Sequence, residues 1–132
     1  MWLLTSIEQA EKIYELCVNS AKRGETLTYG EVLHALGYRQ GVSGDAIRYG
    51  LELVLIACAD RDLPMLTAIV VNQSNGEPTP DEPAGSSWAK DREKVFKYKT
   101  WPDVATFAWA AVWDNRKELS AKYGTKGYWG VD

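Results

Sequence analysis

The chain carries the same helix-start pattern twice within its first quarter. Thr5-Ser6-Ile7-Glu8 and Thr28-Tyr29-Gly30-Glu31 each place a threonine three residues before a glutamate. In such a capping box the hydroxyl accepts a hydrogen bond from the backbone N–H of the glutamate, and the carboxylate accepts one from the backbone N–H of the threonine. Two such starts in close succession predict two successive helices, and this constrains the fold more than any other feature.

Apolar residues at helical spacing extend the first helix over residues 6 to 22. The second helix begins at Thr28 and is short, because Gly37 follows. Ser43 is a good N-cap for a third helix over residues 44 to 59. Two helices joined by a tight glycine-containing loop, behind a first helix, are typical of a helix-turn-helix core.

The segment after Leu63-Pro64 is rich in β-branched residues, and residues 66 to 72 alternate in a way that predicts a buried strand. Asn75-Gly76 is a strong turn signal. The loop over residues 77 to 87 is rich in proline, glycine and acidic residues. A strand, a turn and a loose extension resemble the wing of a winged helix, although the prolines oppose a return strand.

Residues 88 to 101 fit two structures, because a helix over 88 to 94 and a strand over 95 to 101 are both compatible with the pattern. Thr100-Trp101-Pro102-Asp103 then caps a last helix that we expect to run to about Lys122. We therefore expect one α+β domain over residues 1–132. It has a helix-turn-helix, winged-helix-like core, a short β element and a long C-terminal helix.

Composition narrows the class of protein. The 132 residues, 45% hydrophobic and 25% charged, suit one globular core without disulfides. A net charge of −3 differs from the strongly basic balance of dedicated nucleic-acid binders, so any nucleic-acid site is a local patch. The run Leu53–Ala59 is far shorter than the roughly 20 residues that span a bilayer, and the first residues are too short for a signal peptide. We expect a cytoplasmic protein with no membrane contact.

Few residues suggest catalysis. Cys17 and Cys58 lie on apolar stripes and are expected to be buried thiols, and the lone His34 is expected at or near the surface rather than as a general base. Asp45 and Glu52 are either an acid–base pair or the solvated side of the third helix, and we favour the second interpretation. No phosphate-binding, dinucleotide-binding or nucleophile motif occurs. We therefore expect no metal or other cofactor, and an enzyme has the least support.

One family resemblance follows from these motifs. The run Leu27 to Val32, then Leu36-Gly37, a helix, Leu63-Pro64 and a β-branched strand resembles the helix-turn-helix domain of alkylguanine DNA alkyltransferases and alkyltransferase-like proteins, over about half of the chain. The resemblance implies that Tyr29 contacts the DNA backbone at a flipped nucleotide. The reactive segment of the family is Pro-Cys-His-Arg, whereas this chain has Pro64-Met65-Leu66-Thr67. Its arginine finger falls near Ser43. The resemblance therefore implies the fold without alkyl transfer.

Two binding functions remain. The last helix is apolar nearly all round, which favours a surface for a protein partner or for self-association. We expect a non-enzymatic binding module, such as an adaptor or inhibitor, that uses Trp101, Trp109 and Trp113.

The alternative is a winged-helix-like nucleic-acid binder. The middle helices supply polar and basic side chains, and lysines that alternate with Phe96 and Tyr98 resemble a single-strand binding groove. The same alternation also suits a half-buried segment with its lysines in water. The expected contact residues are Tyr29, Arg39, Gln40, Ser43, Arg48, Lys97 and Lys99.

Overall fold

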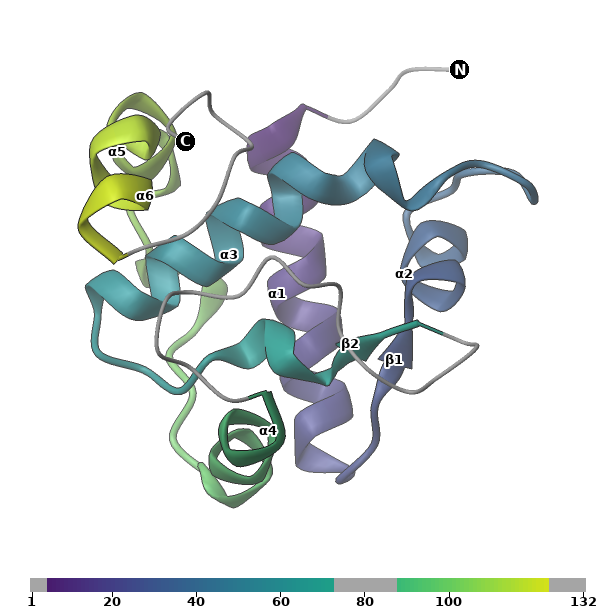
Figure 1. Ribbon diagram of the computed structural model, residues 1–132, viewed down its shortest axis with the longest axis horizontal. Helices are drawn as coiled ribbons and strands as arrows, with labels where there is room; N and C mark the ends of the chain where they lie inside the picture. The colour runs from purple at the N-terminus through teal and green to yellow at the C-terminus, as the bar shows by residue number, and fades with distance from the viewer. Residues whose placement is uncertain (1–4, 73–87, 124–132) are drawn as a thin grey trace.

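The computed structural model describes residues 5–72 and 88–123, and helices dominate this part of the chain (Figure 1). The broad class is α+β, as predicted, because two short strands pair in parallel. Leu27 of β1 (Leu27–Thr28) lies opposite Val70 of β2 (Val70–Val71). The remaining elements are α1 (Ser6–Lys22), α2 (Tyr29–Ala35), the 3-10 turn η1 (Gly44–Ile47), α3 (Arg48–Asp60), the 3-10 turn η2 (Leu66–Ile69), α4 (Trp88–Lys97), the 3-10 turn η3 (Val104–Thr106), α5 (Trp109–Asp114) and α6 (Arg116–Tyr123).

The helix starts predicted at Thr5 and Thr28 are confirmed, and Ser43 is confirmed as a cap, although of a 3-10 turn. The Thr5 hydroxyl accepts from the N–H of Glu8 at 3.1 Å, and the Thr5 N–H donates to the Glu8 carboxylate at 2.9 Å. Thr28 and Glu31 form the second box, at 3.1 and 2.8 Å. Ser43 caps η1, which leads directly into α3. Each start is fixed by side chains within three residues of it, and this explains why the sequence alone identified them.

Helix α3 is the centre of the core. Residues 52 to 58 are all buried, and α1, α5, α6 and η2 pack around the helix. Helices α1 and α3 cross closely at Gly50, where a Cβ atom would lie 2.7 Å from the Gln9 Cβ. The Gln9 amide is buried at this crossing and donates to the carbonyl of Ala46 at 3.0 Å and to the Tyr38 hydroxyl at 2.7 Å. Figure 1 shows α3 crossing α1, with α4 and the α5–α6 pair on different sides of it.

The structure corrects the prediction for residues 66 to 72 and decides between the two alternatives for residues 88 to 101. The predicted strand over residues 66 to 72 is wrong for its first part, since η2 occupies Leu66–Ile69 and only β2 is extended. Leu66, Ala68 and Ile69 are all buried. A helical turn can bury all three side chains on one side, whereas a strand would point successive side chains to opposite faces. For residues 88 to 101 the helical alternative is found, as α4. The expected turn at Asn75-Gly76 and the loop over 77 to 87 lie outside the described residues.

The expected long C-terminal helix is not continuous. It is divided into η3, α5 and α6, and Asp103 rather than Thr100 caps the first of these. Phe107 interrupts the helical backbone with φ −84° and ψ 141°. The break lets Phe107 and Trp109 both face Tyr14, with ring centroids 4.7 and 6.0 Å from it. Two residues that are two positions apart in an unbroken helix do not share a face, so packing both rings inward requires the interruption.

Three helices end in the same backbone motif. In each, the second residue after the helix cap donates its N–H to a carbonyl in the last turn, at 3.0, 3.0 and 2.9 Å for the pairs Glu25–Ser20, Tyr38–Leu33 and Leu63–Cys58. The residue before each donor has a positive φ, as this Schellman motif requires. Gly24 and Gly37 hold that position after α1 and α2, with φ 69° and 88°. After α3 the position is held by Asp62, with φ 57°, the one non-glycine residue of 5–72 and 88–123 in this conformation.

Candidate functional site

The three tryptophans predicted to bind a partner do not form one surface. Trp109 is only 5% exposed, its indole N–H donates to the Val104 carbonyl at 3.0 Å, and its ring stacks on Phe107 at 4.9 Å. The prediction that Trp109 contacts a partner is therefore corrected, because its side chain belongs to the core. A large ring buried in this way stabilises the fold and is not available for binding.

Trp101 and Trp113 are half-buried, and each is held by a neighbour. The Trp101 ring meets Tyr98 edge-on with centroids 4.8 Å apart. The Arg116 guanidinium lies 3.9 Å above the centre of the Trp113 ring, and its Nη1 donates to the Trp113 carbonyl at 2.8 Å. A tryptophan covered by a cation is a rigid, partly exposed contact of the kind that protein interfaces favour.

A cleft of about 330 Å³ lies where α5 and α6 meet the end of α3. Its floor is apolar and includes Ala108 and Ala111, whose small side chains are exposed. Charged residues bound it, namely Asp60, Glu118 and Lys122. The Asp60 carboxylate also accepts a hydrogen bond from the hydroxyl of Tyr123, the last residue of α6, at 2.9 Å. The cleft therefore combines an apolar floor with a charged rim, which is the general anatomy of a protein interface.

The residues predicted to bind nucleic acid fall into two groups. Arg39, Gln40 and Ser43 are exposed in the loop between α2 and α3, while Tyr29 and Arg48 are half-buried. Arg39 and Gln40 line a small cleft of about 230 Å³ together with the exposed His34 and with Tyr38.

The two lysines of that set lie elsewhere. Lys97 ends α4 and pairs with Glu93 at 3.1 Å, and Lys99 donates to the Phe96 carbonyl at 3.2 Å. Figure 1 places α4 away from the α2–α3 loop, so the two groups do not form one surface. In the first turn of α3, Arg48 is half-buried and Tyr49 is 42% exposed. Residues 52 to 58 are buried, so the rest of the helix has no continuous exposed face that could enter a DNA groove.

Glu52 was expected to be solvated, and the structure corrects this. Its side chain is 2% exposed, and it accepts a long hydrogen bond from the buried Ser120 hydroxyl of α6, at 3.5 Å. Arg48 lies four residues before Glu52 in α3, and Arg116 lies four residues before Ser120 in α6. Each arginine is therefore on the same helix face as the polar residue that follows it. A buried carboxylate needs polar compensation. The signal that could have revealed this burial is that Glu52 is the one charged residue between Leu51 and Cys58. The sequence prediction instead assumed that one side of this helix faces solvent.

The two cysteine thiols lie in the core. Cys17 and Cys58 are free and fully buried, as predicted. Burial raises the pKa of both thiols, that of Cys58 to about 12, so both are protonated at neutral pH. Across residues 5–72 and 88–123, no three or more His, Cys, Asp or Glu side chains gather as a metal site would require. In the same ranges, no helix has both the length and the apolar character to cross a bilayer.

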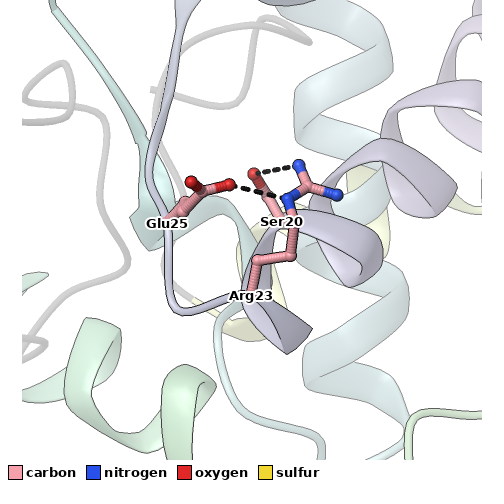
Figure 2. A network of polar contacts seen from close by, with 3 residues as sticks. All are labelled: Ser20, Arg23 and Glu25. Atoms are coloured by element: carbon pink, nitrogen blue, oxygen red, sulfur yellow. Dashed lines mark hydrogen bonds and ion pairs between the residues drawn. The ribbon is translucent and has the colours of Figure 1, made fainter.

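A shallow cleft of about 500 Å³ beside the end of α1 is lined by Arg23, but this side chain is already engaged. Its Nε donates to the Glu25 carboxylate at 2.6 Å, and its Nη2 donates to the Ser20 hydroxyl at 3.4 Å (Figure 2). Both members of the pair are more than half exposed, at 58% and 60%. Such an exposed pair contributes little stability, and its internal neutralisation makes the cleft a poor anion site.

Comparison of the chain with protein-family models, with curated proteins and with solved structures found no match. The structure thus identifies the class of fold, a mostly helical α+β arrangement around a buried central helix. The resemblance to the alkyltransferase helix-turn-helix domain stays a prediction.

Proposed function

We propose that this protein is a non-enzymatic binding module that acts through protein–protein contact, as an adaptor or inhibitor, on the face formed by α5 and α6. The observation that carries this proposal is the cleft of about 330 Å³ with exposed Ala108 and Ala111 in its lining. Alanine side chains let a partner approach the helix backbone closely, and their apolar surface gains from being covered.

The rim of the cleft indicates the chemistry of the partner. Asp60 and Glu118 carry two negative charges against the single positive charge of Lys122. The excess of one negative charge favours a partner whose apolar anchor is accompanied by a basic side chain. A short amphipathic helix with small apolar residues on one face meets both requirements, since it can lie in a groove between two helices.

Two features support the binding role without defining the partner. Trp113 and Arg116 form a rigid aromatic–cation pair in α5 and α6, and these two residue types are enriched among energetically dominant interface residues. The unpaired thiols of Cys17 and Cys58 agree with a reducing compartment, so we propose the cytoplasm as the site of action.

The test compares two alanines of the same helix. Ala111→Glu places a charged side chain in the cleft, whereas Ala110→Glu places it at an exposed position of α5 that does not line the cleft. Affinity capture from the native lysate, with and without nuclease, is followed by a binding measurement on each purified partner. We expect the wild type and Ala110→Glu to bind the same partner, and Ala111→Glu to lose it with an unchanged melting temperature. Equal binding by all three proteins contradicts the proposal.

Nucleic-acid binding is the alternative, and it is carried by the exposed pair Arg39 and Gln40 in the α2–α3 loop. It has weaker support because Lys97 and Lys99 lie apart from that loop and because the net charge is −3. A gel-shift assay at low salt tests it, with Arg39→Ala as the variant. Binding that weakens with added salt and with this substitution would favour the alternative over the protein-binding module.

A further inference from the structure

We propose that two copies of this chain bind one another through the α5–α6 face and form a dimer with twofold symmetry. Each copy covers the cleft of about 330 Å³ on the other, so the assignment of a second copy rests on the binding role proposed for that face. A second copy fits better than another protein because the charges on the rim of the cleft complement themselves when one copy is turned by 180°.

Two opposite charges stand one helical turn apart on this rim. Glu118 and Lys122 both belong to α6, and both line the cleft. A glutamate four residues before a lysine is the order that favours an ion pair within a helix. That pair does not form. Within residues 5–72 and 88–123, the Glu118 carboxylate makes no ion pair or hydrogen bond, and the Lys122 ammonium lies 5.2 Å from the centre of the Tyr123 ring. Both charges are therefore left for a partner to neutralise.

This pair of charges matches itself about a twofold axis. A partner that complements both must place a base opposite Glu118 and an acid opposite Lys122, at the same separation and in the reverse order. An identical helix that runs antiparallel to α6 supplies this order by symmetry. Glu118 then meets Lys122 of the partner subunit, and the symmetric contact forms a second ion pair. An unrelated helix has to match the two positions independently.

The apolar floor of the cleft supplies the favourable free energy of association. Ala108 and Ala111 are exposed, and the half-buried Leu119 of α6 lines the same cleft. Covering apolar surface drives most protein association, and small side chains let two helices approach closely. The floor is covered on both copies, because each presents the same face. Figure 1 places α5 and α6 at the edge of the molecule, away from α2 and α4.

The third charge on the rim limits the affinity. Asp60 lies at the end of α3, and its carboxylate accepts a hydrogen bond from the Tyr123 hydroxyl of its own chain at 2.9 Å. The symmetric pairing of Glu118 with Lys122 leaves no base for Asp60, so one unmatched negative charge remains on each copy. We therefore expect a dimer that dissociates on dilution.

Sedimentation velocity of the full chain, measured from low to millimolar concentration, tests the proposal by exchanging the charges. Glu118→Lys leaves both positions of α6 basic, and Lys122→Glu leaves both acidic. Each variant alone should dimerise at least about tenfold more weakly than the wild type, because like charges then meet across the axis. An equimolar mixture of the two variants should associate again, because every acid then faces a base. Lys117→Glu is the matched control, since Lys117 is exposed on α6 outside the lining of the cleft, and it should dimerise as the wild type does.

Glutamate and lysine have similar helix propensities, so both reversals keep the helix, and circular dichroism of each variant checks this. A chain that stays monomeric at every concentration overturns the proposal. A dimer that neither reversal weakens, or reversals whose mixture stays monomeric, also overturns it. If the chain is monomeric while Ala111→Glu still loses a partner captured from the lysate, another protein covers the face. The second copy is then ruled out, and the proposed binding role stands.

Discussion

Gly50 lies where α1 and α3 cross, and replacing it by alanine tests the central contact of the fold. A Cβ atom at this position would lie 2.7 Å from the Gln9 Cβ, 2.9 Å from the Gln9 Oε1 and 3.0 Å from the Ile13 Cδ1. The Cβ of Gln9 is fixed to the backbone of α1 and cannot rotate away. The substitution therefore forces the two helices apart or displaces the buried Gln9 amide from its partners.

The magnitude follows from opposing effects. Alanine in place of glycine inside a helix contributes about 1 kcal/mol in favour of folding. Overpacking of a close helix crossing costs about 1–3 kcal/mol. Moving Gln9 also weakens its hydrogen bonds to the Ala46 carbonyl and the Tyr38 hydroxyl, each of which is worth about 1 kcal/mol. We expect Gly50→Ala to lower the free energy of unfolding by about 1–3 kcal/mol.

The assay is urea unfolding followed by circular dichroism and tryptophan fluorescence, with Gly30→Ala as the matched control. Gly30 lies in the exposed first turn of α2, and the nearest atom to an added Cβ is the Thr28 hydroxyl at 3.9 Å. Here only the gain in helix propensity applies, so the midpoint should rise by an amount equivalent to at most about 1 kcal/mol. If both variants shift the unfolding midpoint in the same direction, the reasoning about the α1–α3 crossing is wrong.

Three further predictions follow from buried and capping groups. Cys17 and Cys58 should resist a thiol reagent at mildly alkaline pH in the native protein and react fully in urea, because burial raises the pKa of both thiols. Rapid reaction of the native protein would contradict their burial. Hydrogen bonds from the backbone and side chain of the helix cap lower the pKa of Glu8 below 4.5, so its stabilising effect is present above that pH and is lost as the pH falls through the folded-state pKa. The difference in melting temperature between wild type and Glu8→Gln should therefore shrink on acidification, and a constant difference would refute the cap. Trp109→Ala should destabilise by about 3–5 kcal/mol, measured by urea unfolding, and a loss below about 1 kcal/mol would show that the ring is not in the core.

Three helical starts could be predicted from the sequence because their causes are local. Thr5, Thr28 and Ser43 each accept a hydrogen bond from a backbone N–H within three residues. The break in the expected C-terminal helix could not be predicted in this way. It follows from Tyr14, which lies far away in the sequence and draws both Phe107 and Trp109 to the same side. Helix propensity near residue 107 carries no information about that partner.

The candidate sites were harder to predict than the fold, for a related reason. Trp109 has the residue type of an interface anchor, and only its position against Tyr14 shows that it belongs to the core. Glu52 looked like a solvated residue because its partner, Ser120, comes from a helix at the other end of the chain.

Burial of α3 on several sides links the fold to the proposed function. The first helix covers one side of α3, and α5 and α6 cover another, so the third helix cannot serve as a free recognition helix along its length. The exposed residues of α3 itself lie near its two ends, at Tyr49 and Asp60. The proposed α5–α6 cleft agrees with this, because Asp60 in the last turn of α3 lines it. Covering the central helix thus explains why the proposed cleft is built mainly from α5 and α6 and includes α3 only at its end.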